Sequence, residues 1–424
     1  MKIFVIGGGG REHALIWKLS QNPDIKQIYV APGNGGMDEI ATRVHLSVND
    51  GQSLLQFAKE KEIDLTVVGP EAPLAAGIVD LFEKKGLKIF GPSQRAALLE
   101  GSKVFSKEFM RKYEIPTADF LVANTPQEAM SAIERGRFSY PFVIKADGLA
   151  AGKGVIVVSS KEEAVKAVEK IMVSKEFGGA GERLILEEFL TGQETSFMVF
   201  SDGKRAFPMV TSKDYKRRDN GNEGPNTGGM GAISPSPFID YASIRMVMET
   251  IIMPTVFGMA QESRLFKGVL YAGLMMTPQG PKVLEFNCRF GDPETQTIML
   301  RLQSDLLEIF LGIVNNSLSD VDIDWSMNAS GTVVLASGGY PERYETGKEI
   351  YGLSRGTMME GVQIFHAGTE KRDSKFLTSG GRVLNVCATA PSLQTVMEKI
   401  YTAVSFVSFE GMNYRNDIGV EEKT

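Results

Sequence analysis

The chain has 424 residues, which fits two or three domains at roughly 100 to 200 residues each. Its 43% hydrophobic and 23% charged residues are typical of a globular protein that can bury a sizeable core. The formal net charge of -6 argues against a broad nucleic-acid-binding face, because neutralising phosphates needs clustered Lys and Arg in excess.

The cysteines and the N-terminal sequence bear on the cellular compartment. Only two cysteines occur, Cys288 and Cys387, and their wide separation predicts neither a disulfide framework nor a zinc site. The chain opens on strand-like residues 2–6, without the basic and apolar regions of a signal peptide. No apolar run reaches the ~18 residues of a membrane span. We therefore expect a cytoplasmic protein with no nucleic-acid or membrane partner.

The N-terminal part of the chain alternates apolar segments with segments of helical period. The strand-like segments are residues 2–6, 27–30, 64–68 and 88–90. Strands that alternate with helices predict βαβ units around a parallel sheet. Ligands bind at the carboxyl ends of such strands, where Gly-rich loops follow the first three, at residues 7–10, 31–36 and 69–71.

The opening loop of four glycines, Gly7 to Gly10, precedes a helical segment, as in dinucleotide-binding folds. The spacing differs, because Glu12 stands where the third glycine of that fingerprint belongs. Two interpretations stay open. The loop either presents a helix N-terminus to a single phosphate, or it is a tight turn that needs positive φ.

Residues 119–190 predict a small α+β lobe with strands at 142–146, 155–158 and 184–188. Capping boxes that begin at Thr125 and Ser160 mark two helix starts. Lys145 ends a strand, and a Gly-rich and Ala-rich turn then carries Lys153. This pattern suits a mobile flap over a triphosphate, and the alternative is a loose hairpin with two solvated lysines.

A second strand of this lobe ends in polar residues. Glu187 and Glu188 are followed by the apolar pair Phe189 and Leu190, with Glu194 four residues farther on. Apolar side chains here suit a planar base, and a carboxylate suits ribose hydroxyls. The alternative is an ordinary solvated strand exit.

The most informative segment is residues 284–294. Strand alternation places Glu285, Asn287 and Arg289 on one face. Magnesium takes one or two oxygen side chains plus substrate phosphates, and a guanidinium binds a carboxylate or a phosphoryl group. The pattern therefore predicts a metal and phosphate site, with a surface salt-bridge strand as the alternative.

A basic run at 212–218 leads into the Gly-rich segment 224–231, which can wrap a small anionic substrate, although a solvated face followed by a loop has the same pattern. Helical patterns follow at 241–261 and 304–315. A last block, 328–424, contains strand patterns at 331–336 and 381–390 and a helix from 392 to about 406.

Taken in order, these motifs resemble the ATP-grasp superfamily and, within it, the phosphoribosylamine-glycine ligase family, also called glycinamide ribonucleotide synthetases. The resemblance rests on residues 7–13, 69–74, 225–231 and 287–294 and covers essentially the full length. It implies an α/β and α+β multidomain fold. The implied parts are a parallel N-terminal substrate domain (1–103), an ATP-grasp domain (104–325, lid lobe 119–190) and a small mixed C-terminal domain (326–424).

The resemblance implies an ATP-dependent ligase of purine biosynthesis that joins glycine to 5-phosphoribosylamine through glycyl phosphate. ATP would be bound by Lys103, Lys145, Lys153, Glu187, Glu188, Phe189, Leu190 and Glu194. Mg²⁺ or Mn²⁺ would be bound by Glu285 and Asn287. The substrates would be bound by Gly9, Gly10, Glu71, Asp214, Lys216, Asn226, Thr227, Gly228, Gly229, Arg289, Asp292 and Pro293. Arg289, Asp214 and Lys145 would carry the catalytic roles.

One departure from the family pattern is Tyr215, where the resemblance leads us to expect His. Tyr keeps a hydrogen-bonding tip, so the departure questions the role of that position rather than the activity. Rival interpretations are another ATP-grasp enzyme such as a biotin carboxylase, a nicotinamide oxidoreductase, and a non-catalytic nucleotide-binding regulator. We expect a monomer or a weak homodimer.

Overall fold

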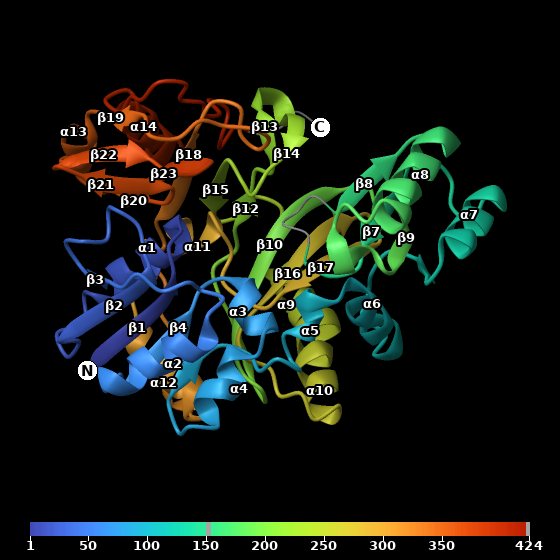
Figure 1. Ribbon diagram of the computed structural model, residues 1–424, viewed down its shortest axis with the longest axis horizontal. Coiled ribbons are helices and arrows are strands. Elements are labelled where there is room, and N and C mark those ends of the chain that lie inside the picture. The colour runs from blue at the N-terminus through green and yellow to red at the C-terminus, as the bar shows by residue number, and fades with distance from the viewer. Residues whose placement is uncertain (150–153, 421–424) are drawn as a thin grey trace.

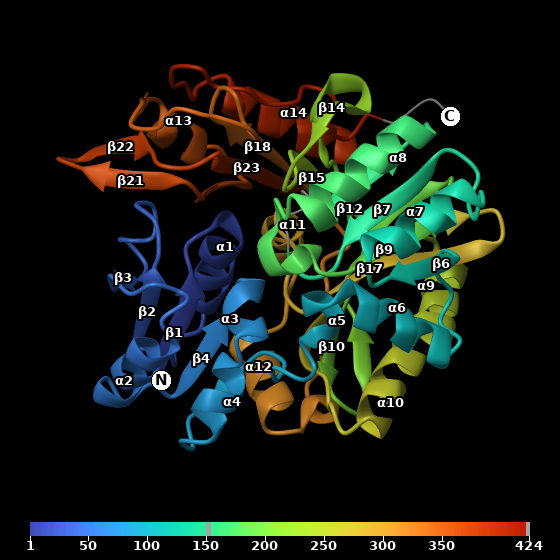
Figure 2. The ribbon, with the colours of Figure 1, turned by 45° about the vertical axis from the view of Figure 1, so that its right-hand side comes forward.

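The computed structural model describes residues 1–149 and 154–420, so Lys153 lies outside the described residues. Figure 1 shows the N-terminal and C-terminal regions stacked on one side and a separate small lobe on the other. The central sheet lies between them, and Figure 2 shows strands of the C-terminal region above helix α1. This mixture of a parallel sheet with antiparallel layers confirms the predicted fold class.

The N-terminal region is a parallel sheet in the order β3-β2-β1-β4-β5. Its strands are β1 (Lys2–Gly7), β2 (Gln27–Pro32), β3 (Thr42–Arg43), β4 (Leu65–Val68) and β5 (Ile89–Phe90). Its helices are α1 (Gly10–Leu19), α2 (Gly51–Glu60), α3 (Glu71–Ala75) and α4 (Ile78–Glu83). Strands β1 and β4 are almost wholly buried, which explains their continuous apolar sequence. The strand order reverses at β1 and β4, so the crevice for ligands opens at their carboxyl ends.

Helices α5 (Leu98–Gly101) and α6 (Lys103–Lys112) lead into the small lobe. The lobe is an antiparallel sheet in the order β6-β9-β7-β8, with two helices and a π-helical turn. Its elements are β6 (Phe120–Ala123), α7 (Pro126–Glu134), β7 (Phe142–Ala146), β8 (Val155–Val158), α8 (Lys161–Val168), the π turn Glu169–Val173 and β9 (Leu184–Glu188). Thr125 and Ser160 cap α7 and α8 as their sequence boxes predict.

The central region contains an antiparallel sheet in the order β11-β10-β16-β17. Its strands are β10 (Gln193–Asp202), β11 (Ala206–Pro208), β16 (Lys267–Thr277) and β17 (Gly280–Asn287). Its helices are α9 (Tyr241–Val247), the π turn Met248–Ile252, α10 (Met253–Gln261), α11 (Glu294–Met299) and α12 (Leu306–Val314). The register pairs Gly273 with Glu285, so no side chain stands opposite that glutamate on β16.

One stretch of this region, Tyr241–Gln261, is long and apolar enough to cross a membrane by length and composition alone. Its mean hydropathy is 1.2, and its apolar face, which includes Val247, Ile251 and Val256, is buried in the main core. A core helix passes the same test, so the stretch is weak evidence for a membrane span.

The C-terminal region shares its main sheet with the central region. The order β12-β15-β18-β23-β20 joins two strands from before residue 325 to three from after it. The strands are β12 (Lys213–Asp214), β15 (Gly231–Ser234), β18 (Ala329–Ala336), β20 (Val362–His366) and β23 (Arg382–Ala390). A second sheet contains β19 (Glu349–Ile350), β22 (Lys375–Thr378) and β21 (Thr369–Arg372), and the helices are α13 (Leu353–Thr357) and α14 (Leu393–Val404). The domain boundary near 325 stays a prediction.

Between β12 and β15 lies a separate hairpin of β13 (Arg217–Asp219) and β14 (Glu223–Asn226). Short 3-10 turns occur at Gly178–Gly181, Asn220–Asn222 and Leu318–Asp320. Aromatic side chains join the N-terminal and central regions. The centre of the Phe90 ring lies 4.1 Å from the centre of the Phe310 ring and 6.2 Å from that of the Phe290 ring. These ring contacts place the end of β5 against α12 and against the segment that follows β17.

Candidate active site

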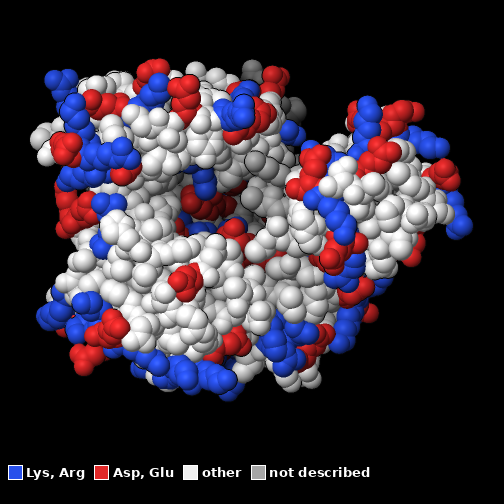
Figure 3. Space-filling model, viewed as in Figure 1, with Lys and Arg blue, Asp and Glu red and all other residues white. Residues whose placement is uncertain are grey.

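A cavity of about 430 Å³ opens where the N-terminal, central and C-terminal regions meet. Figure 3 shows a hollow in this face of the molecule with acidic and basic side chains on its floor. Eleven of the predicted site residues line the cavity: Glu71, Lys103, Lys145, Asp214, Lys216, Thr227, Gly228, Glu285, Asn287, Arg289 and Asp292. Residues more than 200 positions apart in sequence thus form one site.

Two predicted phosphate-binding lysines lie on one side of the cavity. Lys103 Nζ donates to Gly148 O at 2.8 Å, in the segment that the sequence predicts to form a flap. Lys145 Nζ donates to Leu284 O at 3.1 Å and forms a buried ion pair with Glu187. Burial lowers the pKa of Lys103, and the nearby Glu285 carboxylate opposes that shift. A bound polyphosphate would offset the cost of burying these cations.

Glu187 is buried between two lysines and does not line the cavity. Its Oε2 lies 2.7 Å from Lys107 Nζ, and its Oε1 pairs with Lys145. Burial would raise the pKa of Glu187, but the two lysines together lower it. Burial also lowers the pKa of Lys107 to about 8. Glu187 therefore orients Lys145, a role that the sequence pattern did not indicate, and its contact with adenine stays a prediction.

The other predicted nucleotide residues lie around this ion pair. Glu188 Oε2 accepts from Asp119 N at 3.2 Å, while Leu190 packs with Ala118 and Met275. Phe189 is 40% exposed. Glu194 Oε2 lies 3.1 Å from Lys216 Nζ in a small side cavity next to the main one. Their roles toward base and ribose stay predictions, as does that of Lys153.

Glu285 and Asn287 project from one face of β17 into the cavity, as alternation predicts. Burial would raise the pKa of Glu285, but Lys216, Lys145, Lys103 and Arg289 together lower it, so the side chain stays a carboxylate. These hard oxygen donors fit Mg²⁺ or Mn²⁺. Among the described residues no group of three or more His, Cys, Asp and Glu side chains could hold a metal ion. A metal at this site would therefore need oxygens of the nucleotide phosphates as further ligands.

Arg289 is held at the floor of the cavity by three acceptors. Its Nε lies 3.3 Å from Glu71 Oε2, and its Nη2 lies 3.2 Å from Glu100 Oε1 and 3.3 Å from Asn287 Oδ1. Burial opposes the charge, but Glu100 and Glu71 raise the pKa of Arg289 above its ordinary value. A fixed guanidinium of this kind stabilises negative charge that develops on a transferring phosphoryl group.

Asp214 has a buried carboxylate oxygen, Oδ1, with no hydrogen-bond partner among the described residues. Burial and the nearby Glu294 raise the pKa of Asp214 well above its ordinary range, while Lys216 and Arg382 oppose the shift. An uncompensated carboxylate in a cavity is costly unless a ligand supplies a donor. The side chain therefore suits an ammonium group.

The N-terminal glycine loop lies beside this cavity. Gly9 N donates to Glu12 Oε2 at 2.7 Å, which completes the capping box of α1. A Cβ on Gly10 would lie 2.2 Å from Asn385 Nδ2, so this glycine is needed for close packing, whereas Gly7 has φ +133°. Glu71, at the start of α3, faces Arg289 in the cavity. A phosphate-binding role for Gly9 and Gly10 stays a prediction.

Residues 226–229, which we call the substrate loop after their predicted role, begin at the last residue of β14. Thr227 and Gly228 line the cavity, whereas Asn226 is exposed and pairs with Arg217. A Cβ on Gly229 would lie 2.4 Å from Pro293 Cδ, so Pro293 supports the loop from below. Asp292 Oδ1 accepts from Gln296 Nε2 at 2.8 Å. The loop and the turn at 292–293 thus form one wall.

Tyr215, the departure from the family pattern, points away from the cavity into the C-terminal core. It is 3% exposed, and its hydroxyl accepts from Gly419 N at 3.1 Å. The guanidinium of Arg415 lies 5.1 Å from the centre of its ring. Tyr215 therefore fixes the C-terminal segment, which explains how the position tolerates Tyr.

Several cavity residues were missed from the sequence: Arg11, Glu100, Lys107, Tyr271, Glu294 and Arg382. Glu294 accepts from Tyr271 Oη at 2.6 Å and from Ser196 Oγ at 2.9 Å. Arg11, directly after the glycine loop, Glu294, at the end of the informative segment 284–294, and Arg382, directly after two glycines, had local signals. Glu100, Lys107 and Tyr271 lie within helices or a strand whose sequences indicate only packing.

Comparison with known proteins gives the family. Three family models match in order: the phosphoribosylglycinamide synthetase N domain over residues 1–100, its ATP-grasp (A) domain over 101–295 and its C domain over 330–421. The chain belongs to the phosphoribosylglycinamide synthetase family. A phosphoribosylamine-glycine ligase of Salmonella typhimurium is 50% identical over 424 residues, which is 99% of this chain and 98% of the relative.

Solved structures agree with membership of the synthetase family. Phosphoribosylamine-glycine ligase from Thermotoga maritima has a TM-score of 0.85 at 35% identity and covers 98% of this chain and 100% of its own. Biotin carboxylase from Campylobacter jejuni has a TM-score of 0.76 at 14% identity and covers 97% of this chain and 92% of its own, which shows a shared fold alone. The resemblance drawn from the sequence is confirmed, and the oxidoreductase alternative has no support.

Proposed function

We propose that this chain joins glycine to 5-phosphoribosylamine in de novo purine biosynthesis, at the expense of ATP and through glycyl phosphate. The observation that carries the proposal is the content of one cavity. An unpartnered Asp214 oxygen and the Arg289 guanidinium lie in it together with Lys103, Lys145 and Glu285. This set supplies an ammonium acceptor, an anion acceptor and a polyphosphate site within reach of one another.

In the first step a glycine carboxylate oxygen attacks the γ-phosphorus of ATP. The bond from that phosphorus to the β,γ-bridging oxygen breaks, which gives glycyl phosphate and ADP. Arg289 and the two lysines stabilise the negative charge that shifts between the phosphate oxygens. Magnesium or manganese, held by Glu285 and Asn287, would add positive charge at the phosphates.

In the second step the amine nitrogen of phosphoribosylamine attacks the carbonyl carbon of glycyl phosphate. The bond from carbon to the bridging oxygen breaks, phosphate leaves, and the proton released by the nitrogen goes to the departing phosphate. Asp214 holds the glycine ammonium group in both steps, while Gly9, Gly10 and Glu71 face the phosphoribosyl group. The residues act by positioning and electrostatics, since phosphoryl transfer leaves little covalent chemistry to the protein.

We infer a cytoplasmic enzyme with small-molecule partners, acting as a monomer or weak homodimer. Both cysteines are free and buried, which agrees with a reducing compartment.

The function is tested by measuring the release of phosphate from ATP in the presence of magnesium. Purified protein is given glycine and phosphoribosylamine together, each alone, and phosphoribosylamine with bicarbonate. We expect release only when both substrates are present. Release with a single substrate, or with bicarbonate in place of glycine, contradicts the proposal, and the latter result favours carboxylating chemistry of the kind named for the fold neighbour.

A further inference from the structure

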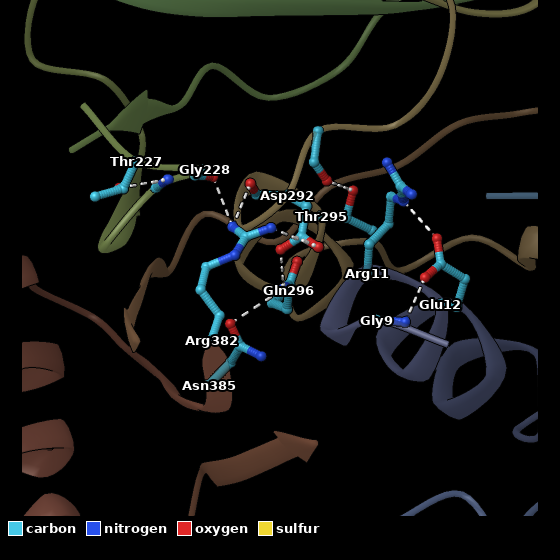
Figure 4. A network of polar contacts seen from close by, with 12 residues as sticks. Gly9, Arg11, Glu12, Thr227, Gly228, Asp292, Thr295, Gln296, Arg382 and Asn385 are labelled. Carbon is cyan, nitrogen blue, oxygen red and sulfur yellow. Dashed lines mark hydrogen bonds and ion pairs between the residues drawn. The ribbon is translucent and has the colours of Figure 1, made fainter. Parts of the chain in front are cut away.

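Both backbone groups of Gly228 are bound by side chains of the C-terminal region. Gly228 N donates to Tyr340 Oη at 3.0 Å, and Arg382 Nη1 donates to Gly228 O at 2.6 Å. Figure 4 shows the Arg382 guanidinium pointing toward Gly228 and Asp292. The middle of the substrate loop is thus fixed from a region more than 100 residues away in sequence.

Arg382 also binds the neighbouring turn. Its Nη1 donates to Asp292 O at 2.8 Å, and its Nη2 lies 3.2 Å from Asp292 Oδ2. Burial opposes the charge of Arg382, but Asp292 and other acidic neighbours raise its pKa, so it stays a cation. A planar fork of this kind holds two acceptors in fixed geometry. One side chain therefore joins the substrate loop to the Asp292 turn.

The packing around these contacts is tight at Gly228 and at Gly381. A Cβ on Gly228 would lie 3.1 Å from Arg382 Cζ and 3.3 Å from Tyr340 Oη. A Cβ on Gly381 would lie 2.3 Å from Tyr340 Cδ2, so the Tyr340 ring covers that glycine. The two glycines thus allow the close approach that these hydrogen bonds require.

The hairpin that carries the substrate loop is also held at its other end. Asp417 Oδ2 accepts from Gly221 N at 2.8 Å, and Asn416 N donates to Asn220 Oδ1 at 3.0 Å. The hairpin strands β13 and β14 pair only with each other among the described strands. Its position consequently depends on the C-terminal region.

We propose that Tyr340 and Arg382 are positioning residues that fix the substrate loop beside Asp214 for glycine binding. The inference rests on the proposed function. A Cβ on Gly229, the next residue, would lie 2.8 Å from Asp214 Oδ1, so displacement of the Gly228 peptide changes the surroundings of that carboxylate. The nucleotide-facing Lys103 and Lys145 lie on α6 and β7, which these two side chains do not hold. Loss of the hydrogen bonds therefore weakens glycine binding and leaves nucleotide binding unchanged.

The test compares KM for glycine with KM for ATP in Tyr340→Phe, Arg382→Lys and Arg382→Gln. Tyr344→Phe is the matched control, because it removes the same hydroxyl from an exposed ring four positions away. We expect KM for glycine to rise about tenfold in Tyr340→Phe and more in Arg382→Gln, which is the scale of a lost hydrogen bond. Because Arg382→Lys keeps the positive charge, its KM for glycine should lie between those of wild type and Arg382→Gln. KM for ATP stays close to wild type in all three variants, and the thermal midpoint stays close to wild type in Tyr340→Phe.

An unchanged KM for glycine in Tyr340→Phe overturns the inference, and so does an equal rise in the KM for ATP, since that result indicates general loss of structure. If Arg382→Gln does not fold, Tyr340→Phe decides alone. Wild-type protein is assayed in parallel: failure of the proposed function appears as wild-type protein that does not require glycine, whereas failure of this inference leaves wild type active and the variants equal to it.

Discussion

Gly229 lies over the carboxylate of Asp214, because a Cβ on Gly229 would lie 2.8 Å from Asp214 Oδ1. The backbone at Gly229 has φ +109°, a conformation that side chains rarely adopt. The unpartnered carboxylate oxygen therefore faces the substrate loop at a point where only glycine fits.

We predict that Gly229→Ala loses most of its ligase activity. The added methyl group would meet both Asp214 and the Pro293 ring, at 2.4 Å from its Cδ, so the loop must move. Gly221→Ala is the matched control, because Gly221 has φ +69° but open space around it. Gly221→Ala reports the effect of backbone strain alone, whereas Gly229→Ala adds the contact with Asp214 and Pro293. Steady-state turnover is measured for both variants, and an equal loss of activity in the two would contradict the predicted contact.

Asp214→Asn is expected to raise KM for glycine by about 10-fold to 100-fold, the scale of a lost hydrogen bond to a charged group. Because burial raises the pKa of Asp214, wild-type affinity for glycine falls as pH decreases and the carboxylate takes up a proton. The variant has no such titration. A glycine KM that rises equally on acidification in both proteins would rule out Asp214 as the titrating group.

The Glu187 ion pairs make a prediction about stability. Glu187→Gln leaves Lys107 and Lys145 buried without a countercharge, so we expect the free energy of unfolding to fall by about 3 to 5 kcal/mol. Glu176→Gln in the same lobe removes an exposed pair with Lys170 and serves as the control. Urea unfolding measures both, and similar stability of the two variants would contradict the prediction.

His13 and His366 predict acid sensitivity where the N-terminal and C-terminal regions meet. His366 N donates to His13 Nδ1 at 2.9 Å. Burial lowers the pKa of His13 to about 4 and that of His366 to about 3. Between pH of about 6.5 and about 4, the unfolded chain, whose His pKa is about 6.5, binds more protons than the folded chain. The free energy of unfolding is therefore highest above pH of about 6.5 and falls as pH decreases toward 4.

His13→Asn places a non-titrating acceptor near the position of Nδ1. Denaturant unfolding at several pH values should therefore show a weaker loss of stability on acidification in this variant than in wild type. His45→Asn changes an exposed histidine and should leave the dependence of the free energy of unfolding on pH as it is in wild type. If wild type and His13→Asn show the same dependence, His13 is not the source of the acid sensitivity.

Glu285→Ala is expected to lower turnover about 100-fold or more while the circular dichroism spectrum stays native, because the change removes one of two oxygen side chains that fit the metal. Unchanged turnover would remove the metal assignment. Binding of ATP without metal provides a second measurement and should persist, since Lys103 and Lys145 remain.

The sequence predicts local features of this fold well. The apolar strands of the parallel sheet, the capped helices of the small lobe and the polar face of β17 follow from periodicity and short-range hydrogen bonding. The same alternation brings Glu285 and Asn287 to one face of β17, whereas Arg289 lies two residues beyond the end of that strand and reaches the same cavity through its contacts with Glu71 and Glu100.

Long-range partners could not be predicted in this way. Nothing local indicates that Lys107 meets Glu187, that Gly10 packs on Asn385, or that Arg382 binds Gly228. Each contact joins segments whose separation is set by the tertiary fold. The sheet that combines β12 and β15 with β18 is a further case, since its strands lie on both sides of the predicted domain boundary.

The most direct test of the central claim uses glycine labelled with oxygen-18 in its carboxylate. During ligation with ATP and phosphoribosylamine, mass spectrometry of the released phosphate follows the label. Attack by the carboxylate on the γ-phosphorus, followed by cleavage of the bond from carbon to the bridging oxygen, predicts one labelled oxygen in every phosphate formed. Unlabelled phosphate released in step with product would contradict the glycyl phosphate route.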